Sequence, residues 1–295
     1  MKLWPDLGVA LLIFLPGLAV AETPAKPALY AVLVGVNAPA LSGSKLLYPA
    51  KDAGDLATTL RAQSGKAFRS VEVRTLIEAE ATRDHVLDGL DWLARQTTAR
   101  DVALVFLAGQ GVDEPRTGLS GSRAGEAGPT RADGDPTPSG RYYYFPADGD
   151  PGAVKRSLVS SADLHDALAS IAGKAILFLD ACRTTEIGAR KLRCSSDLEW
   201  FARAPARGER PVAVLASSTG GQAASEDPAL ANGALARAII DGLSGAADPQ
   251  HTGAVTVDLL DRYLAGRVRE LTHGAQTPVS ANLGGLRGLT LALVR

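Results

Sequence analysis

Four uninterrupted apolar runs and one alternating segment recur along the chain. The runs cover residues 28–36, 102–108, 175–179 and 212–216, and the alternating segment covers residues 71–76. Runs of this length, rich in Val and Leu, are typical of strands buried on both faces of a sheet. Between and after these segments, apolar residues recur at helical spacing in residues 52–63, 82–93, 161–171, 233–243 and 257–268. Thr82 and Ser161 are the expected N-caps of two of these helices.

Buried strands that alternate with amphipathic helices predict an α/β fold. We expect a doubly wound, mainly parallel sheet with helices on both faces. In such sheets, ligands and catalytic groups gather at the carboxyl ends of the strands. Polar residues follow three of the predicted strands directly, as Gly109-Gln110-Gly111, Asp180-Ala181-Cys182-Arg183 and Ser217-Ser218.

Residues 1–21 have the features of an export signal, so we do not expect them to be part of the fold. Lys2 precedes an apolar run of about 14 residues, which is shorter than the roughly 20 needed to span a bilayer as a helix. Ala19-Val20-Ala21 fits a signal-peptidase site, so the mature chain is expected to begin at Glu22. The alternative is an uncleaved N-terminal anchor. Cleavage predicts an exported protein, periplasmic or secreted, with no stable membrane insertion.

The remaining chain divides into one domain and its extension. Residues 28–245 carry the predicted sheet and its helices, and residues 246–295 are expected to form a C-terminal extension of the same domain that contains helix and strand. Segment 113–141 is rich in Gly, Pro, Ser, Thr and Arg, with Leu119 as its single large apolar residue. This composition is typical of a long, flexible surface loop inserted into the domain. Whether the loop is processed stays open.

Composition narrows the function classes. The 31 basic and 32 acidic residues give a formal net charge of −1, which argues against a dedicated nucleic-acid binder. Two cysteines cannot form a disulfide framework, and four histidines without HExxH or CxxC do not suggest a metal site. The sequence also lacks a GxxxxGK[ST] phosphate-binding loop. We therefore expect neither a cofactor nor a metal.

The strand ends resemble the caspase and metacaspase superfamily of clan CD cysteine peptidases. The resemblance covers roughly residues 28–243, and Leu179-Asp180-Ala181-Cys182-Arg183 is similar to the family's nucleophile motif. Four further pieces follow the family's order: 30–37 resembles its first strand, 51–53 the start of its first helix, 144–148 the stretch after its long loop, and 212–233 its small-subunit region. The resemblance implies a caspase-like fold and a protein or peptide substrate or ligand, and it leaves the oligomeric state open.

The resemblance assigns roles to residues at the strand ends. It implies that Cys182 is the nucleophile and that Asp180 lines an acidic pocket for a substrate Arg or Lys, where a carboxylate pairs with a guanidinium. Ser217 and Ser218 are implied to contact substrate, and Gly111 is a candidate for the oxyanion site.

One position departs from the family. Its catalytic histidine lies between two glycines after the third strand, and here that position is Gln110. A cysteine peptidase needs a thiolate and a proton donor for the leaving amine, and an amide side chain cannot exchange a proton. Losing a general acid–base costs about 10² to 10⁴ in rate. We therefore expect a catalytically impaired pseudoprotease with a binding or regulatory role. The alternative is an active cysteine endopeptidase that cuts after Arg or Lys.

Several assignments keep a simpler alternative. Cys182 and Cys194 either form a small disulfide or remain free thiols. Asp180 either lines the pocket or caps the following turn, and Asp52 is expected to cap its own helix. None of the four histidines, His85, His165, His251 and His273, follows a buried strand, so none is expected to replace the missing one.

Overall fold

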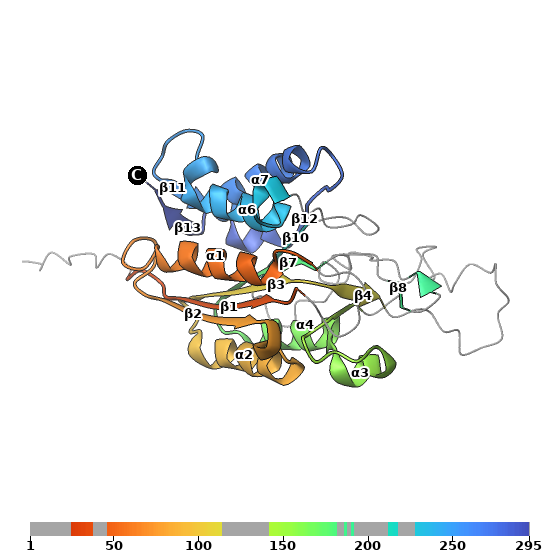
Figure 1. The fold of residues 1–295 in the computed structure, drawn as a ribbon. Coiled ribbons are helices and arrows are strands. Elements are labelled where there is room, and N and C mark those ends of the chain that lie inside the picture. Colours follow the sequence, from red (N-terminus) through yellow and green to blue (C-terminus); the bar gives the residue numbers. More distant parts are fainter. Residues whose placement is uncertain are drawn as a thin grey trace, which may run out of the picture.

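The structure is a computed structural model that describes residues 25–37, 46–113, 142–181, 186–187, 190–191, 212–217 and 228–294. Its centre is a six-stranded sheet in the order β12-β10-β7-β3-β1-β2 (Figure 1). Five strands run parallel, and β12 pairs antiparallel with β10 at the edge. The strands are β1 Leu29–Gly35, β2 Val71–Ile77, β3 Val102–Ala108, β7 Lys174–Asp180, β10 Val212–Ala216 and β12 Val279–Ala281.

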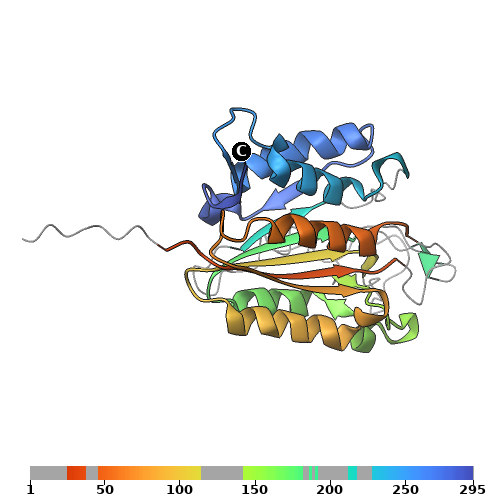
Figure 2. The same ribbon diagram turned by 60° about the vertical axis from the view of Figure 1, so that its left-hand side comes forward.

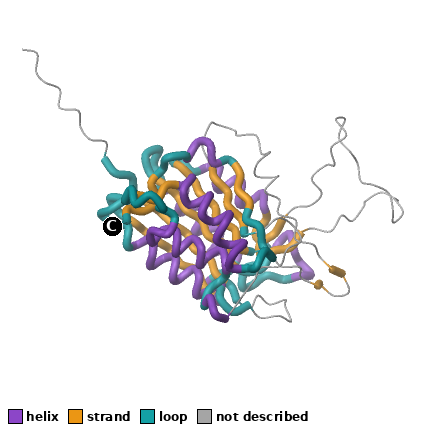
Figure 3. The backbone as a smooth tube through the Cα atoms, turned by 90° about the horizontal axis from the view of Figure 1, so that it is seen from above, coloured by secondary structure: helices purple, strands orange, loops and turns teal. Residues whose placement is uncertain are grey.

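Helices cover both faces of this sheet (Figures 2 and 3). One face carries α1 (Pro49–Arg61), α6 (Ala234–Asp241) and α7 (Val257–Leu271). The other face carries α2 (Arg83–Gln96) and α4 (Ser161–Ser170). Side chains of β1 alternate between the two cores, as strand geometry requires, with Leu33 on the α1 face and Val34 on the α2 face. The predicted α/β class, with a mainly parallel sheet between two helical layers, is confirmed.

Smaller elements surround the sheet. β4 (Gly111–Asp113), β5 (Tyr142–Tyr144) and β6 (Val159–Ser160) form a three-stranded sheet, and β11 (Ala254–Thr256) pairs with β13 (Thr290–Leu293). A hairpin joins β8 (Glu186–Ile187) to β9 (Arg190–Lys191). The remaining helical turns are α3 Val154–Ser157, the 3₁₀ turns Glu78–Glu80, Pro151–Ala153, Pro228–Leu230 and Leu283–Leu286, and the π-turn Gly242–Ala246.

The structure corrects one cap and adds one strand. Thr82 caps α2 as predicted, but the N-cap of α4 is Ser160 rather than Ser161. The reason is the capping box, in which Ser160 and Asp163 exchange side-chain and backbone hydrogen bonds. The sixth strand, β12, was not predicted. It comes from segment 246–295, so this segment contributes to the central sheet.

Several predictions fall outside the described residues. These are the export signal at 1–21, nearly all of the inserted loop at 113–141, and the site residues Cys182, Cys194 and Ser218. Among the residues that the structure does describe, no helix is both long enough and apolar enough to cross a membrane.

Candidate functional site

The carboxyl ends of β3 and β7 lie side by side. Ala108 of β3 is level with Asp180 of β7, and the Gly109 N–H donates to the Asp180 carbonyl at 3.2 Å. The main chain therefore carries Gln110 and Gly111 alongside Ala181, the residue that precedes Cys182 in the sequence. Parallel pairing of two adjacent strands is enough to bring these two motifs together.

The two glycines around Gln110 are required for different reasons. Gly109 has φ +144°, a conformation that residues with a side chain rarely adopt. Gly111 has no such constraint, but a Cβ there would lie 2.4 Å from the Ala181 carbonyl oxygen and 2.5 Å from the Tyr142 hydroxyl. One glycine permits the turn, and the other permits close packing of the turn against the end of β7.

Two buried tyrosines of β5 hydrogen-bond to the main chain at these strand ends. The Tyr142 hydroxyl donates to the Ala181 carbonyl at 3.2 Å, and the Tyr144 hydroxyl donates to the Ala108 carbonyl at 2.9 Å. Burial, with a smaller contribution from the charge of Glu78, raises the pKa of Tyr144 well above its usual value. Its phenol therefore remains a hydrogen-bond donor at every physiological pH.

Gln110 itself is buried, with only 1% of its surface exposed. Its backbone carbonyl accepts a hydrogen bond from the Phe145 N–H at 2.9 Å, which ties the turn to the chain after β5. The side chain can donate and accept hydrogen bonds, but it has no proton to exchange near neutral pH.

Ser217 lies at the end of β10, one strand beyond β7. Its N–H donates to the Leu179 carbonyl at 3.0 Å, and the residue is fully buried. Its Oγ has no hydrogen-bond partner among the described residues. A buried hydroxyl in this state is a free donor and acceptor beside β7.

The Asp180 side chain meets Asp52 of α1 at Gly233, the residue before α6. A Cβ placed on Gly233 would lie 2.9 Å from Asp52 Oδ2 and 3.1 Å from Asp180 Oδ2, so both carboxyl groups converge on this bare Cα. Asp52 is 2% exposed and Asp180 is 8% exposed. We refer to Asp52 and Asp180 as the acidic pair.

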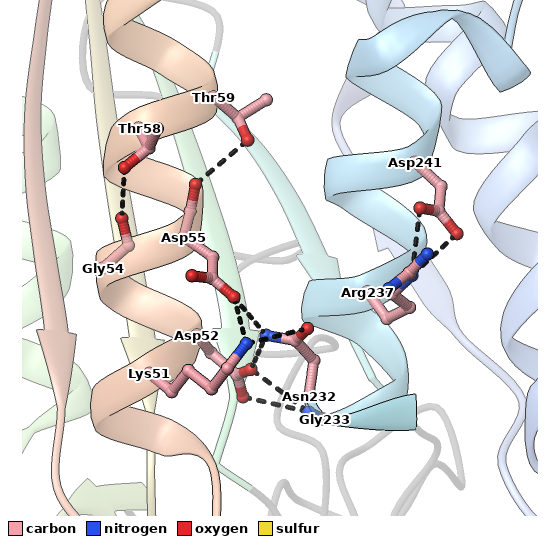
Figure 4. A network of polar contacts seen from close by, with 10 residues as sticks. All are labelled: Lys51, Asp52, Gly54, Asp55, Thr58, Thr59, Asn232, Gly233, Arg237 and Asp241. Carbon is pink, nitrogen blue, oxygen red and sulfur yellow. Dashed lines mark hydrogen bonds and ion pairs between the residues drawn. The ribbon is translucent and has the colours of Figure 1, made fainter. Parts of the chain in front are cut away.

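Asn232 joins Asp52 of the acidic pair to other residues of α1 and to the start of α6 (Figure 4). Its Nδ2 donates to Asp52 Oδ1 at 2.8 Å and to Asp55 Oδ2 at 2.9 Å, and its Oδ1 accepts from Lys51 at 3.5 Å. The Gly233 N–H donates to both Asp52 oxygens, at 3.2 and 3.1 Å. Asn232 therefore uses both donors and its acceptor to clamp α1 against the start of α6.

The acidic pair is electrostatically unusual. Burial raises the pKa of Asp52 from 3.8 to about 7. Hydrogen bonds from Asn232 and Gly233 and the charge of Lys51 oppose this shift, whereas the neighbouring Asp180 adds to it. Two buried carboxyl groups at one point favour a shared proton or a bound cation over two negative charges.

The predicted role of Asp52 as a cap of its own helix is wrong. The N-cap of α1 is Tyr48, with no side-chain cap bond, and the Asp52 carboxyl instead accepts from the N–H at the start of α6. Sequence reasoning also missed Asn232. Its only signal was the Asn-Gly pair immediately before an apolar helix, and that pattern is common in turns.

The four histidines lie at the surface, on other parts of the fold. The His85 ring is within 2.9 Å of the Glu80 carbonyl, and the His165 ring is 3.4 Å from Asp166. His251 and His273 occupy exposed turns with positive φ. Within the described ranges, no group of three His, Cys, Asp or Glu side chains is placed to hold a metal ion.

Comparison with known proteins identifies the family. A model of the caspase domain, a cysteine-peptidase family, matches residues 28–282. The chain belongs to the caspase-domain family. The matched residues include β12. The part of the resemblance that concerns the family is thereby confirmed.

A solved structure supports the fold of this caspase domain. The crystal structure of protein GSU0716 from Geobacter sulfurreducens superposes with a TM-score of 0.57 at 15% identity and covers 91% of this chain and 100% of that chain. At this identity the similarity concerns the fold alone. No curated protein matches the chain.

Proposed function

We propose that this caspase domain binds proteins or peptides through an Arg or Lys side chain held by the acidic pair, and that its peptidase activity is impaired. The observation that carries the proposal is the convergence of Asp52 and Asp180 on Gly233. A guanidinium or ammonium group between these carboxyl groups would relieve their repulsion and gain charge-assisted hydrogen bonds. Asp180 is two residues before Cys182, so the bound side chain would lie beside the expected nucleophile position.

Gln110 is the reason for proposing impairment. Its amide can orient a water or a peptide carbonyl, but it can neither lower the thiol pKa by charge nor protonate a leaving amine. These two tasks account for about 10² to 10⁴ of the rate in general acid–base catalysis. The described histidines lie on other surfaces and offer no substitute at the end of β3.

An active endopeptidase that cuts after Arg or Lys is the second candidate. It is favoured by the glycine-dependent backbone at 109–111, which still packs tightly against Ala181. This candidate requires another group to act as the proton donor.

Peptide binding tests the proposal directly. Two fluorescent peptides would be compared by polarisation, one with Arg and one with citrulline, its uncharged analogue, at the same position. We expect the Arg peptide to bind at least about tenfold more tightly, a difference of one charge-assisted interaction. Asp180→Asn should remove the preference. Asp88→Asn and Asp91→Asn, which remove exposed carboxylates on α2, should preserve it. Equal binding of both peptides by the unmodified protein would overturn the proposal.

Hydrolysis separates the two candidates. Arg- and Lys-terminated fluorogenic peptides would be assayed under reducing conditions with the unmodified protein and with Cys182→Ala. Impairment predicts no difference between them. A rate that depends on Cys182 would instead establish the endopeptidase.

We also propose that the chain is exported and begins at Glu22 after signal cleavage. The support is the short apolar run before Ala19-Val20-Ala21. N-terminal sequencing of protein recovered outside the cytoplasm is the test. An intact Met1 on a membrane-associated product would favour the uncleaved anchor.

A further inference from the structure

A pocket lies at the opposite end of the central sheet from the acidic pair. Its volume is about 1150 Å³, and it opens where β1, β3 and β7 begin. Residues just before or at the start of these strands line one side, and segment 285–290 lines the other. In Figure 2 the strands point away from this end, which lies near the C-terminus of the chain.

Four cationic residues line this pocket, and none of the lining residues that the structure describes is acidic. Lys26 precedes β1, Arg100 precedes β3, Lys174 begins β7, and Arg287 follows the 3₁₀ turn before β13. We call the site the basic pocket. Three of these side chains, those of Arg100, Lys174 and Arg287, have no carboxylate within 4 Å in the described part of the chain, whereas Lys26 donates to the Gly65 carbonyl. Their charges therefore remain available to a ligand.

The acidic residues nearby are engaged elsewhere. Asp101, next to Arg100 in the sequence, is 1% exposed and turns inward, where it accepts from the Ala28 N–H at 2.8 Å and pairs with Arg69 at 2.9 Å. Asp258 accepts from the Gly288 N–H at 3.1 Å. Neither carboxylate neutralises the cations that line the pocket.

Sheet geometry fixes the spacing of the charges. Leu29, Val102 and Lys174 are level with one another on adjacent strands. Adjacent strands lie about 4.8 Å apart, so the starts of β1, β3 and β7, where three of the cationic residues lie, extend over roughly 10 Å. A row of this length suits an anion with several linked charges better than a single phosphate. Two guanidinium groups, from Arg100 and Arg287, can each hold phosphate oxygens in a bidentate manner.

The pocket also has an apolar part. Pro27, Leu286 and Leu289 lie among its lining residues, together with three alanines. A concave site with an apolar wall and convergent charges is typical of small-molecule sites. An acidic peptide, in contrast, spaces its carboxylates along an extended chain and needs an open groove.

We propose that the basic pocket binds a small ligand with an oligophosphate group. The phosphates lie along the cations at the start of β1, β3 and β7, and Arg287 closes the site from the opposite side. The proposal concerns the end of the sheet opposite the acidic pair, so it is independent of the proposed peptide binding.

Titration calorimetry of the full chain at physiological ionic strength tests the proposal. The probes are inorganic tripolyphosphate, ATP, orthophosphate and hexaglutamate. The test variant combines Arg100→Gln with Arg287→Gln, both at exposed positions. The matched control combines Arg95→Gln with Arg269→Gln, which removes the same charge from exposed helical sites away from the pocket. Unchanged melting temperatures would show that both variants fold.

We expect tripolyphosphate to bind at a single saturable site, more tightly than orthophosphate. The test variant should bind it about tenfold more weakly for each guanidinium removed, and the control should bind it as the unmodified protein does. Tighter binding of ATP would indicate that the apolar wall holds a further part of the ligand, and equal binding would indicate recognition of the phosphates alone. The proposal is overturned by no saturation up to about 1 mM, by equal losses in both variants, or by hexaglutamate binding as tightly as tripolyphosphate.

Discussion

Replacing Asp52 by asparagine tests the charge state of the acidic pair. Asparagine has the shape of a protonated carboxyl group, and its oxygen can still accept from Asn232 and from the Gly233 N–H. The variant therefore mimics the neutral form of Asp52 at every pH. Comparison of this variant with the unmodified protein isolates the effect of ionising this one buried side chain.

The magnitude follows from the pKa of Asp52. A rise from 3.8 to about 7 corresponds to about 4 kcal/mol of preference for the neutral form in the folded state. Between pH 4 and pH 7 the folded protein holds a proton on Asp52 that the unfolded chain has lost. The contribution of Asp52 to the free energy of unfolding is therefore greatest below pH 4, falls as the pH rises to 7, and is constant above.

Urea denaturation of both proteins between pH 5 and pH 8 measures this effect. We expect the free energy of unfolding of Asp52→Asn, relative to that of the unmodified protein, to rise by about 1.4 kcal/mol per pH unit up to pH 7 and then to level off. Asp88→Asn, at an exposed position, is the control and should show no such trend. A relative stability of Asp52→Asn that stays constant across this range would refute the reasoning about burial.

Three further predictions concern the same end of the sheet. Gln110→His should restore hydrolysis of Arg peptides to about 10² or more above background, measured with a fluorogenic substrate and abolished by Cys182→Ala; no gain would mean that more than the missing base has been lost. Gly111→Ala should lower the free energy of unfolding by about 1–3 kcal/mol, because its Cβ would lie 2.4 Å from a carbonyl oxygen just after β7. The control Gly54→Ala, where the new methyl group enters open space on α1, should slightly raise the free energy of unfolding, measured by urea denaturation. Asn232→Ala should cost about 1–3 kcal/mol, because it removes the 2.8 Å hydrogen bond to the buried Asp52 carboxyl group, which then keeps only the longer bonds from the Gly233 N–H; a neutral effect in urea titrations would mean that water replaces the amide.

The central sheet could be predicted from sequence because its strands are long and apolar. Residues 28–36 and 102–108 are continuous runs, and such runs are typical of strands covered on both sides. β12 gave no such signal, since Val279–Ala281 is short and only partly buried at the sheet edge. The choice between Ser160 and Ser161 was available in principle, because only Ser160 has an acidic residue three positions later.

The sequence predicts only those site residues that directly follow a predicted strand. Gln110 and Asp180 directly follow apolar runs, so parallel topology alone brings their strand ends together. Asp52 and Gly233 are 181 positions apart, and their contact depends on how α1 packs against the start of α6. A glycine also has no side chain to suggest a role, and its function here is to leave room for two carboxyl groups.

Charged side chains of opposite sign lie at the two ends of the central sheet. Its carboxyl end holds the acidic pair, and its amino end holds the four cations of the basic pocket. The formal net charge of −1 does not reveal that carboxyl groups and cationic side chains gather at opposite ends of the sheet. Under the two proposals, an approaching basic peptide is attracted toward one end and an anion toward the other before either makes contact. Since such steering is screened within about 8 Å at physiological salt, the association rates of both should fall together as salt is added.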